Sequence, residues 1–219
     1  MARASQGSNR QDHEAGDQAE DRVRRGRPRR KAAREGLALA PGTPGGSRPL
    51  TTEEVADLLR STGEAIRSEL GELSEDIASW HPTEGEWCIK ECLGHMIEAE
   101  ARGFAGRIRR ILEEPGRRDA GWDQVQVQRD RNDDARTLQE LVAAFTSMRN
   151  DSLKLVEGLM NTDLGKSCVH EQVGELRVEE LLHEWVHHDR NHFRQVQANI
   201  QAYVWPAMGN ARGFAEVDQ

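Results

Sequence analysis

The chain has 219 residues and a formal net charge of −8, but its charge is unevenly distributed. Residues 1–48 hold 11 Lys and Arg against 6 Asp and Glu, which leaves 19 basic and 32 acidic residues for 49–219. No apolar run approaches the roughly 18 residues that a bilayer crossing needs, and Met1 is followed by polar residues, unlike a secretory signal. Three cysteines do not suggest a disulfide framework. We therefore expect a cytoplasmic protein without a membrane partner.

Residues 1–48 are predicted to be a disordered basic tail and linker, because they contain too few large hydrophobic residues to offset the entropy of ordering. The string from Arg24 to Lys31 resembles an AT-hook, a short element that lies in the DNA minor groove. Arginines suit that narrow, electronegative groove. The alternatives are a solvated basic tail or a start placed too far upstream, and we expect no other nucleic-acid contact. The candidate DNA contacts are Arg25, Gly26, Arg27 and Pro28.

Residues 49–206 show helical periodicity and predict an all-α fold, an antiparallel four-helix bundle. Capping boxes at Thr51 and Thr137 start two of the helices, and Pro206 closes the last one. Between the second and third helices we expect a polar connection anchored only by Trp122. No alternating strand pattern exceeds a few residues, and 207–219 are predicted to be a C-terminal extension. The predicted helices span 51–77, 88–112, 137–159 and 178–203.

Two metal-binding patterns overlap in the fourth predicted helix. His183 and His187 fit the His-Glu-x-x-His pattern of zinc proteases, whereas His188 and His192 form a second pair at i and i+4. At about 100° per residue, the second pair shares the apolar side of the helix. The first pair lies on the solvated side, where a zinc site would have no walls. The helical wheel therefore favours His188 and His192.

A third ligand has to come from another helix, and His95 in the second predicted helix is the candidate. It lies at the edge of the apolar stripe, beside a face of small residues that could leave room for a metal and substrate. Close helix packing and a hydrogen-bonded core histidine are the alternative interpretation. The small residues are Cys88, Cys92, Ala99, Gly103 and Gly106.

The run from Trp80 to Glu100, followed much later by Leu182 to His192, resembles the DinB-like family of bacterial metalloenzymes. The resemblance covers Leu50 to Pro206. It implies a four-helix bundle, often dimeric, that holds a divalent metal through three histidines, which here correspond to His95, His188 and His192. The sequence departs from the family at Cys88, where a serine usually caps the helix.

The resemblance also implies an activity, because characterised relatives include transferases and isomerases that use a low-molecular-weight thiol such as mycothiol or bacillithiol. Zn²⁺, Ni²⁺ and Fe²⁺ all suit nitrogen ligands, and a bound metal can activate a thiol or water. The alternative is a non-catalytic structural or stress-linked bundle whose basic tail touches DNA. Glu100 and Asp189, both in apolar stripes, either accept the free N–H of a ligating imidazole or belong to a buried ion-paired network.

Overall fold

The computed structural model describes residues 48–217. The predicted basic tail therefore lies outside the described residues, apart from Arg48, and so do its candidate DNA contacts Arg25, Gly26, Arg27 and Pro28. Among the described residues, none of the helices combines the length and the hydropathy that a membrane crossing requires.

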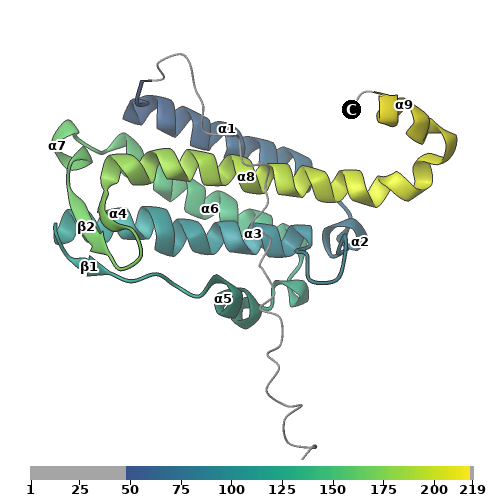
Figure 1. The fold of residues 1–219 in the computed structure, drawn as a ribbon, viewed down its shortest axis with the longest axis horizontal. Helices are drawn as coiled ribbons and strands as arrows, with labels where there is room; N and C mark the ends of the chain where they lie inside the picture. The colour runs from purple at the N-terminus through teal and green to yellow at the C-terminus, as the bar shows by residue number, and fades with distance from the viewer. Residues whose placement is uncertain (1–47, 218–219) are drawn as a thin grey trace, which may run out of the picture. The chain divides into compact units, whose positions relative to one another are not determined.

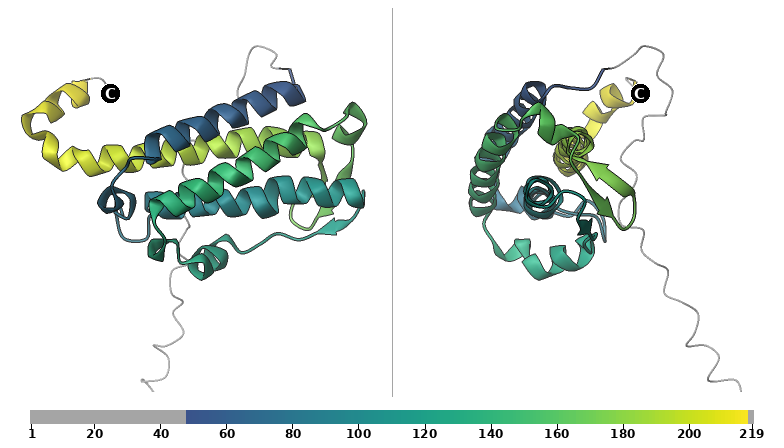
Figure 2. Two further views of the ribbon diagram at one scale, coloured as in Figure 1. Left: turned by 180° about the vertical axis from the view of Figure 1, so that it is seen from behind. Right: turned by 90° about the vertical axis from the view of Figure 1, so that its left-hand side faces the viewer.

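Four long helical segments form a bundle, shown in Figure 1 and from two further directions in Figure 2. The second segment is continuous from α3 through a π-helix, η1, into α4. The predicted all-α four-helix bundle is thus confirmed, and each predicted helix has a counterpart. The bundle segments are α1 (Thr52–Leu70), α3 (Ile89–Glu98) with η1 (Ala99–Phe104) and α4 (Ala105–Glu113), α6 (Leu138–Glu157) and α8 (Val178–Val204).

Three details differ from the prediction. The first helix ends at Leu70 rather than Ile77, because the chain leaves the helix at Gly71 and Ser74 starts a separate short helix. The connection after α4 contains a helix, and a small sheet pairs β1 in parallel and β3 in antiparallel orientation with β2. The shorter elements are α2 (Glu75–Ala78), β1 (Arg118–Asp119), α5 (Gln124–Arg131), η2 (Asp133–Ala135), α7 (Asn161–Leu164), β2 (Ser167–His170), β3 (Gly174–Arg177), η3 (Trp205–Ala211) and α9 (Arg212–Val217).

Of the neighbouring helical segments in the bundle, two pairs run antiparallel and two pairs run parallel. Arg60 of α1 pairs with Glu157 near the end of α6, so these helices run in opposite directions. In contrast, Leu50 and Leu58 contact His183 and Arg190 of α8 in the same order, so α1 and α8 are parallel. The antiparallel order that we predicted therefore holds for α1 with α6 and for α3 with α8.

The segment α3–α4 and the helix α6 run in the same direction, so the chain between them has to travel back along the bundle. Residues 114–137 make this crossover, which carries β1, α5 and η2 over the outer side of α3 (Figure 1). It contacts α3 closely at Gly94, where an added Cβ would lie 1.8 Å from Oδ2 of Asp133. That carboxylate is buried and bound by Arg131 through two hydrogen bonds. The crossover is therefore fixed on the helix rather than loosely attached.

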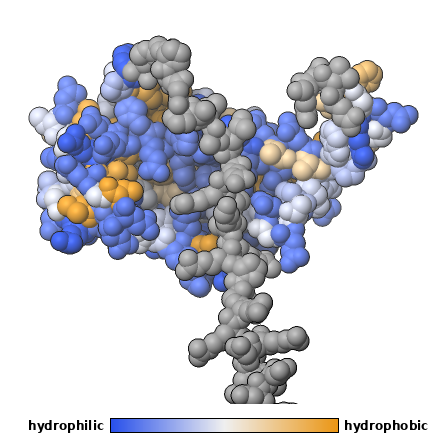
Figure 3. Space-filling view, in the orientation of Figure 1, coloured by the Kyte–Doolittle hydropathy of each residue, from blue (hydrophilic) through white to orange (hydrophobic). Residues whose placement is uncertain are grey.

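The core fills the space between the four helices with aliphatic and aromatic side chains. Phe104 stacks on Trp185, with ring centroids 5.2 Å apart, where η1 meets α8. On the outside, the face in Figure 3 is mainly hydrophilic, and its apolar residues form small separate patches. This distribution agrees with the acidic composition of residues 49–219.

The contact at Gly94 predicts different effects for two Gly→Ala substitutions in the same helical segment. We expect Gly94→Ala to lower the free energy of unfolding by about 1–3 kcal/mol, since it overpacks a buried ion pair. Gly103→Ala has open space around its Cβ, so it should raise stability by up to about 1 kcal/mol through helix propensity. Urea unfolding of both variants checks this, and equal effects would contradict the close contact.

Candidate metal centre

Three imidazoles from two antiparallel helices meet inside the bundle. His95 comes from α3, and His188 and His192 lie one turn apart on α8. The Nε2 atoms of His95 and His188 are 3.0 Å apart, and one ring nitrogen from each histidine lies within 4.8 Å of the other two. The structure thus brings together the three residues that the helical wheel and the family resemblance selected.

In the part of the chain that the structure describes, each of the three imidazoles has at least one ring nitrogen that is not hydrogen-bonded outside the cluster. Nδ1 of His192 donates to Oε1 of Gln195 at 3.1 Å, which leaves its Nε2 unprotonated in the neutral ring. Nδ1 of His95 and of His188 is buried without a hydrogen-bond partner among the described residues. Two nitrogen ligands of one metal ion, each bonded at about 2.0–2.1 Å, lie about 2.9 Å apart at a right angle and about 3.3–3.4 Å apart at a tetrahedral angle, a range that includes the 3.0 Å separation. The three imidazoles therefore fit a divalent metal.

Aromatic rings enclose the three imidazoles. Trp87 lies 5.0 Å from His95 and stacks on His192 at 6.3 Å, measured between ring centroids. Trp122, from the crossover, stacks on His95 with ring centroids 5.9 Å apart. Two indoles therefore pack against the imidazoles on the side of α3 where we expected space for a substrate. The sequence marked Trp122 only as an anchor, and its isolation in a polar segment was the signal for a packing role.

Burial keeps the imidazoles neutral, which is the form that binds metals. Removal from water, together with the nearby His192, lowers the pKa of His95 to about 3. The pKa of His188 is held well below its usual value, again mainly by burial, and that of His192 is lowered for the same reason. Neutral rings are therefore ready for ligation at neutral pH without the loss of a proton.

The predicted acidic residues Glu100 and Asp189 both bind Arg149 of α6. The Arg149 guanidinium donates to both carboxylate oxygens of Glu100 and to both of Asp189, at 2.7–3.2 Å. It also donates to the backbone oxygen of Leu59 in α1. Among the described residues, no hydrogen bond joins either carboxylate to an imidazole. The structure places these acids in the ion-paired network that was one of the two sequence interpretations.

This buried network contains two acids and one base. Burial raises the pKa of Asp189 to about 6, although Arg149 opposes this shift. Burial also acts to lower the pKa of Arg149, but Asp189 and Glu100 outweigh it, so the guanidinium stays charged. Arg149 was not predicted as a functional residue. It lies four residues after Phe145 and four before Leu153 in the buried face of α6, and this spacing was the available signal.

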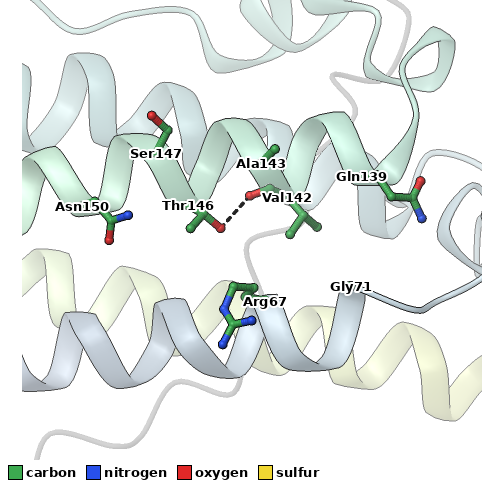
Figure 4. A pocket seen from close by; sticks show the side chains of 8 residues that line it. All are labelled: Arg67, Gly71, Gln139, Val142, Ala143, Thr146, Ser147 and Asn150. Carbon is green, nitrogen blue, oxygen red and sulfur yellow. Dashed lines mark hydrogen bonds between the residues drawn. The ribbon is translucent and has the colours of Figure 1, made fainter.

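The competing protease pair does not form a site. Nδ1 of His183 bonds to the backbone oxygen of Glu179, and its Nε2 accepts from the N–H of Leu50. His187 is exposed on the outer side of α8. A surface groove lies elsewhere, between α1 and α6 (Figure 4). It is lined by Arg67, Gly71, Gln139, Val142, Ala143, Thr146, Ser147 and Asn150, without a metal-ligating set.

A sequence model of the DinB superfamily matches residues 58–196, which contain all three histidines. The chain belongs to the DinB superfamily. No curated protein matches this DinB chain at a significant level.

Two solved structures show the same fold. YfiT from Bacillus subtilis is described as "a probable metal-dependent hydrolase with an unusual four-helix bundle topology". It is 12% identical to this DinB chain at a TM-score of 0.64, covering 73% of this chain and 93% of YfiT. An uncharacterised protein from Clostridium difficile 630 is 14% identical at a TM-score of 0.52, covering 74% and 99% of the two chains.

The hydrogen bond to His192 predicts that Gln195 sets metal affinity. Gln195→Ala frees the imidazole to rotate and to change tautomer, so we expect metal binding to weaken about 10–100-fold. Gln197→Ala, an exposed residue on the same helix, is the matched control and should leave affinity unchanged. Calorimetric titration of the apo protein with Ni²⁺ measures both, and equal affinities for the two variants would contradict this role.

The buried network predicts a large stability difference between two arginines. Arg149→Met leaves two buried carboxylates without a cation, and we expect a loss of about 3–5 kcal/mol in the free energy of unfolding. Arg60→Met removes a half-exposed ion pair and should cost at most about 1 kcal/mol. Urea unfolding compares them. The triple variant with Glu100→Gln and Asp189→Asn should recover part of the loss, and a mild effect of Arg149→Met alone would refute the network's importance.

Proposed function

We propose that the chain is a divalent-metal enzyme of the cytosol in which His95, His188 and His192 hold Zn²⁺, Ni²⁺ or Fe²⁺. The observation that supports this most is the convergence of three neutral imidazole nitrogens within 4.8 Å. With three protein ligands, further coordination positions remain for a small nucleophile, as in catalytic rather than structural metal sites.

The residues around the histidines would prepare this chemistry. Gln195 fixes the tautomer and the orientation of His192, so its Nε2 lone pair is directed into the site. Trp87 and Trp122 pack against His95 and would keep water from it, which strengthens the charge interactions in the site. When bound, a divalent ion supplies Lewis acidity, which makes a water or thiol nucleophile available near neutral pH.

Two reaction types share this mechanism and differ in the nucleophile. The description of YfiT as a probable metal-dependent hydrolase supports water. The family resemblance supports a low-molecular-weight thiol such as mycothiol or bacillithiol, transferred to an electrophile. In both types the metal and its three histidines have the same role, so we propose a metal-activated small nucleophile as the common function.

Loss of a ligand should remove the metal. We expect His188→Ala to lose one metal equivalent and the affinity for Ni²⁺ to fall by more than about 100-fold, since losses outside the ligand set alone cost 10–100-fold. The control is His187→Ala, the exposed neighbour, which should bind like the wild type. Elemental analysis of protein purified without a histidine tag gives the metal content of both variants, and calorimetric titration with Ni²⁺ gives their affinities. Wild-type protein without metal after reconstitution would overturn the proposal.

A substrate screen separates the reaction types. The metal-loaded chain is offered activated esters and amides in water, and electrophiles with each candidate thiol. Turnover that His188→Ala abolishes and His187→Ala retains supports a metal enzyme, whereas turnover retained by His188→Ala contradicts it. Bound metal without turnover in either screen would identify a non-catalytic metal-binding bundle.

A further inference from the structure

A second group of metal-ligating side chains lies at the start of α3. His81 comes from the loop after α2, Cys88 is the residue before α3, and Glu91 is in the first turn of α3. One donor atom from each lies within 4.8 Å of the other two. Nε2 of His81 is 3.1 Å from Oε2 of Glu91, and Sγ of Cys88 is 3.6 Å from Oδ1 of Asp134 in the crossover. Three donors from the loop after α2 and the start of α3 therefore converge, and Asp134 of the crossover contacts one of them.

The local structure positions these side chains and leaves lone pairs of Glu91 for a cation. The loop between His81 and Cys88 reverses at Gly85, which has a positive φ of 89° and is the third residue of the turn closed by the hydrogen bond from Glu86 N to Thr83 O. Glu91 accepts the N–H of Cys88 with Oε2 and the side chain of Gln128 with Oε1. A carboxylate has about four lone-pair sites. Glu91 can therefore accept these bonds and still bind a cation.

The charges around the thiol favour a cation over any reaction of the free cysteine. Burial, together with the neighbouring Glu91 and Asp134, raises the pKa of Cys88 to about 12. Without a cation the thiol stays protonated and is a poor nucleophile. A divalent ion would reverse these conditions, because it attracts both carboxylates and replaces the thiol proton, which is released to solvent.

We propose that His81, Cys88 and Glu91 bind a zinc-class ion, beside Asp134, which contacts the cysteine ligand from the crossover. Thiolate, imidazole and carboxylate are all zinc ligands, and the ligands of one tetrahedral zinc lie about 3.3–3.8 Å apart for bonds of about 2.0–2.3 Å. The separation of 3.1 Å between His81 and Glu91 is close to these values. His81 and Asp134 are exposed, so an ion can reach the buried sulfur from their side.

This second site differs from the three-histidine centre in chemistry and in role. A thiolate among the ligands is typical of structural zinc sites, whereas the first centre has three imidazoles. Its ion would join the loop after α2 to the start of α3, next to the crossover residue Asp134. Trp87, next to Cys88, covers His95 and His192. Occupancy of the second site would therefore hold one wall of the catalytic centre in position.

Cobalt substitution tests the site, because Co²⁺ bound to a thiolate gives an intense near-ultraviolet charge-transfer band that imidazole ligands do not give. We expect this band when the apo form of the full chain is titrated with Co²⁺. Cys88→Ser should abolish it, since Ser keeps a helix cap but offers no thiolate. Cys92→Ala removes a buried thiol one turn away and should retain the band.

An exposed variant keeps the test independent of folding. His81→Ala should bind one Co²⁺ ion fewer than the wild type and lose the band, whereas His187→Ala, which also removes an exposed imidazole, should retain both. In His188→Ala the band should persist, so failure of the three-histidine centre is distinguishable from failure of this site. No band in the wild type, or an unchanged band in Cys88→Ser or His81→Ala, would overturn the proposal.

Discussion

The ion pairs of Arg149 are the interaction on which the rest of the bundle depends. One guanidinium, buried in α6, bonds to η1 through Glu100, to α8 through Asp189 and to α1 through the Leu59 carbonyl. Each of the four bundle segments contributes to this point. Because a buried charge without a partner is very costly, the helices can approach one another only in the register that satisfies all three contacts. A purely apolar core would tolerate several registers.

This register also determines the geometry of the histidines. Asp189 follows His188 directly in α8, and Glu100 lies little more than one turn beyond His95 in the neighbouring segment. The network therefore fixes the two ligand-bearing segments relative to each other, and Trp87 and Trp122 pack against the imidazoles. The centre is built on rigid helices, and the thiol-containing cluster lies at the loop end of one of them.

The parts that could be predicted are those encoded in helical periodicity. The i, i+4 spacing of His188 and His192 and their shared side with Trp185 indicated which pair faces inward, because both lie on one uninterrupted helix. Contacts between distant segments were not predictable in this way. Arg149 carries no local sign of its two partners, and the stacking of Trp122 on His95 depends on the path of the crossover. The first helix extended too far in the prediction because Leu73 and Ile77 continue its apolar spacing beyond Gly71.

The crossover of residues 114–137 exists because two neighbouring helical segments run in the same direction. It supplies Trp122, Gln128 and Asp134, yet it contributes little to the bundle core itself. Loops that surround a rigid site are where insertions and deletions are tolerated best. Relatives could therefore acquire new substrate preferences by changing the length or sequence of this one segment, while the ligand helices and the buried arginine remain as they are. In this fold, the crossover that the helix directions require is also the segment most open to evolutionary variation.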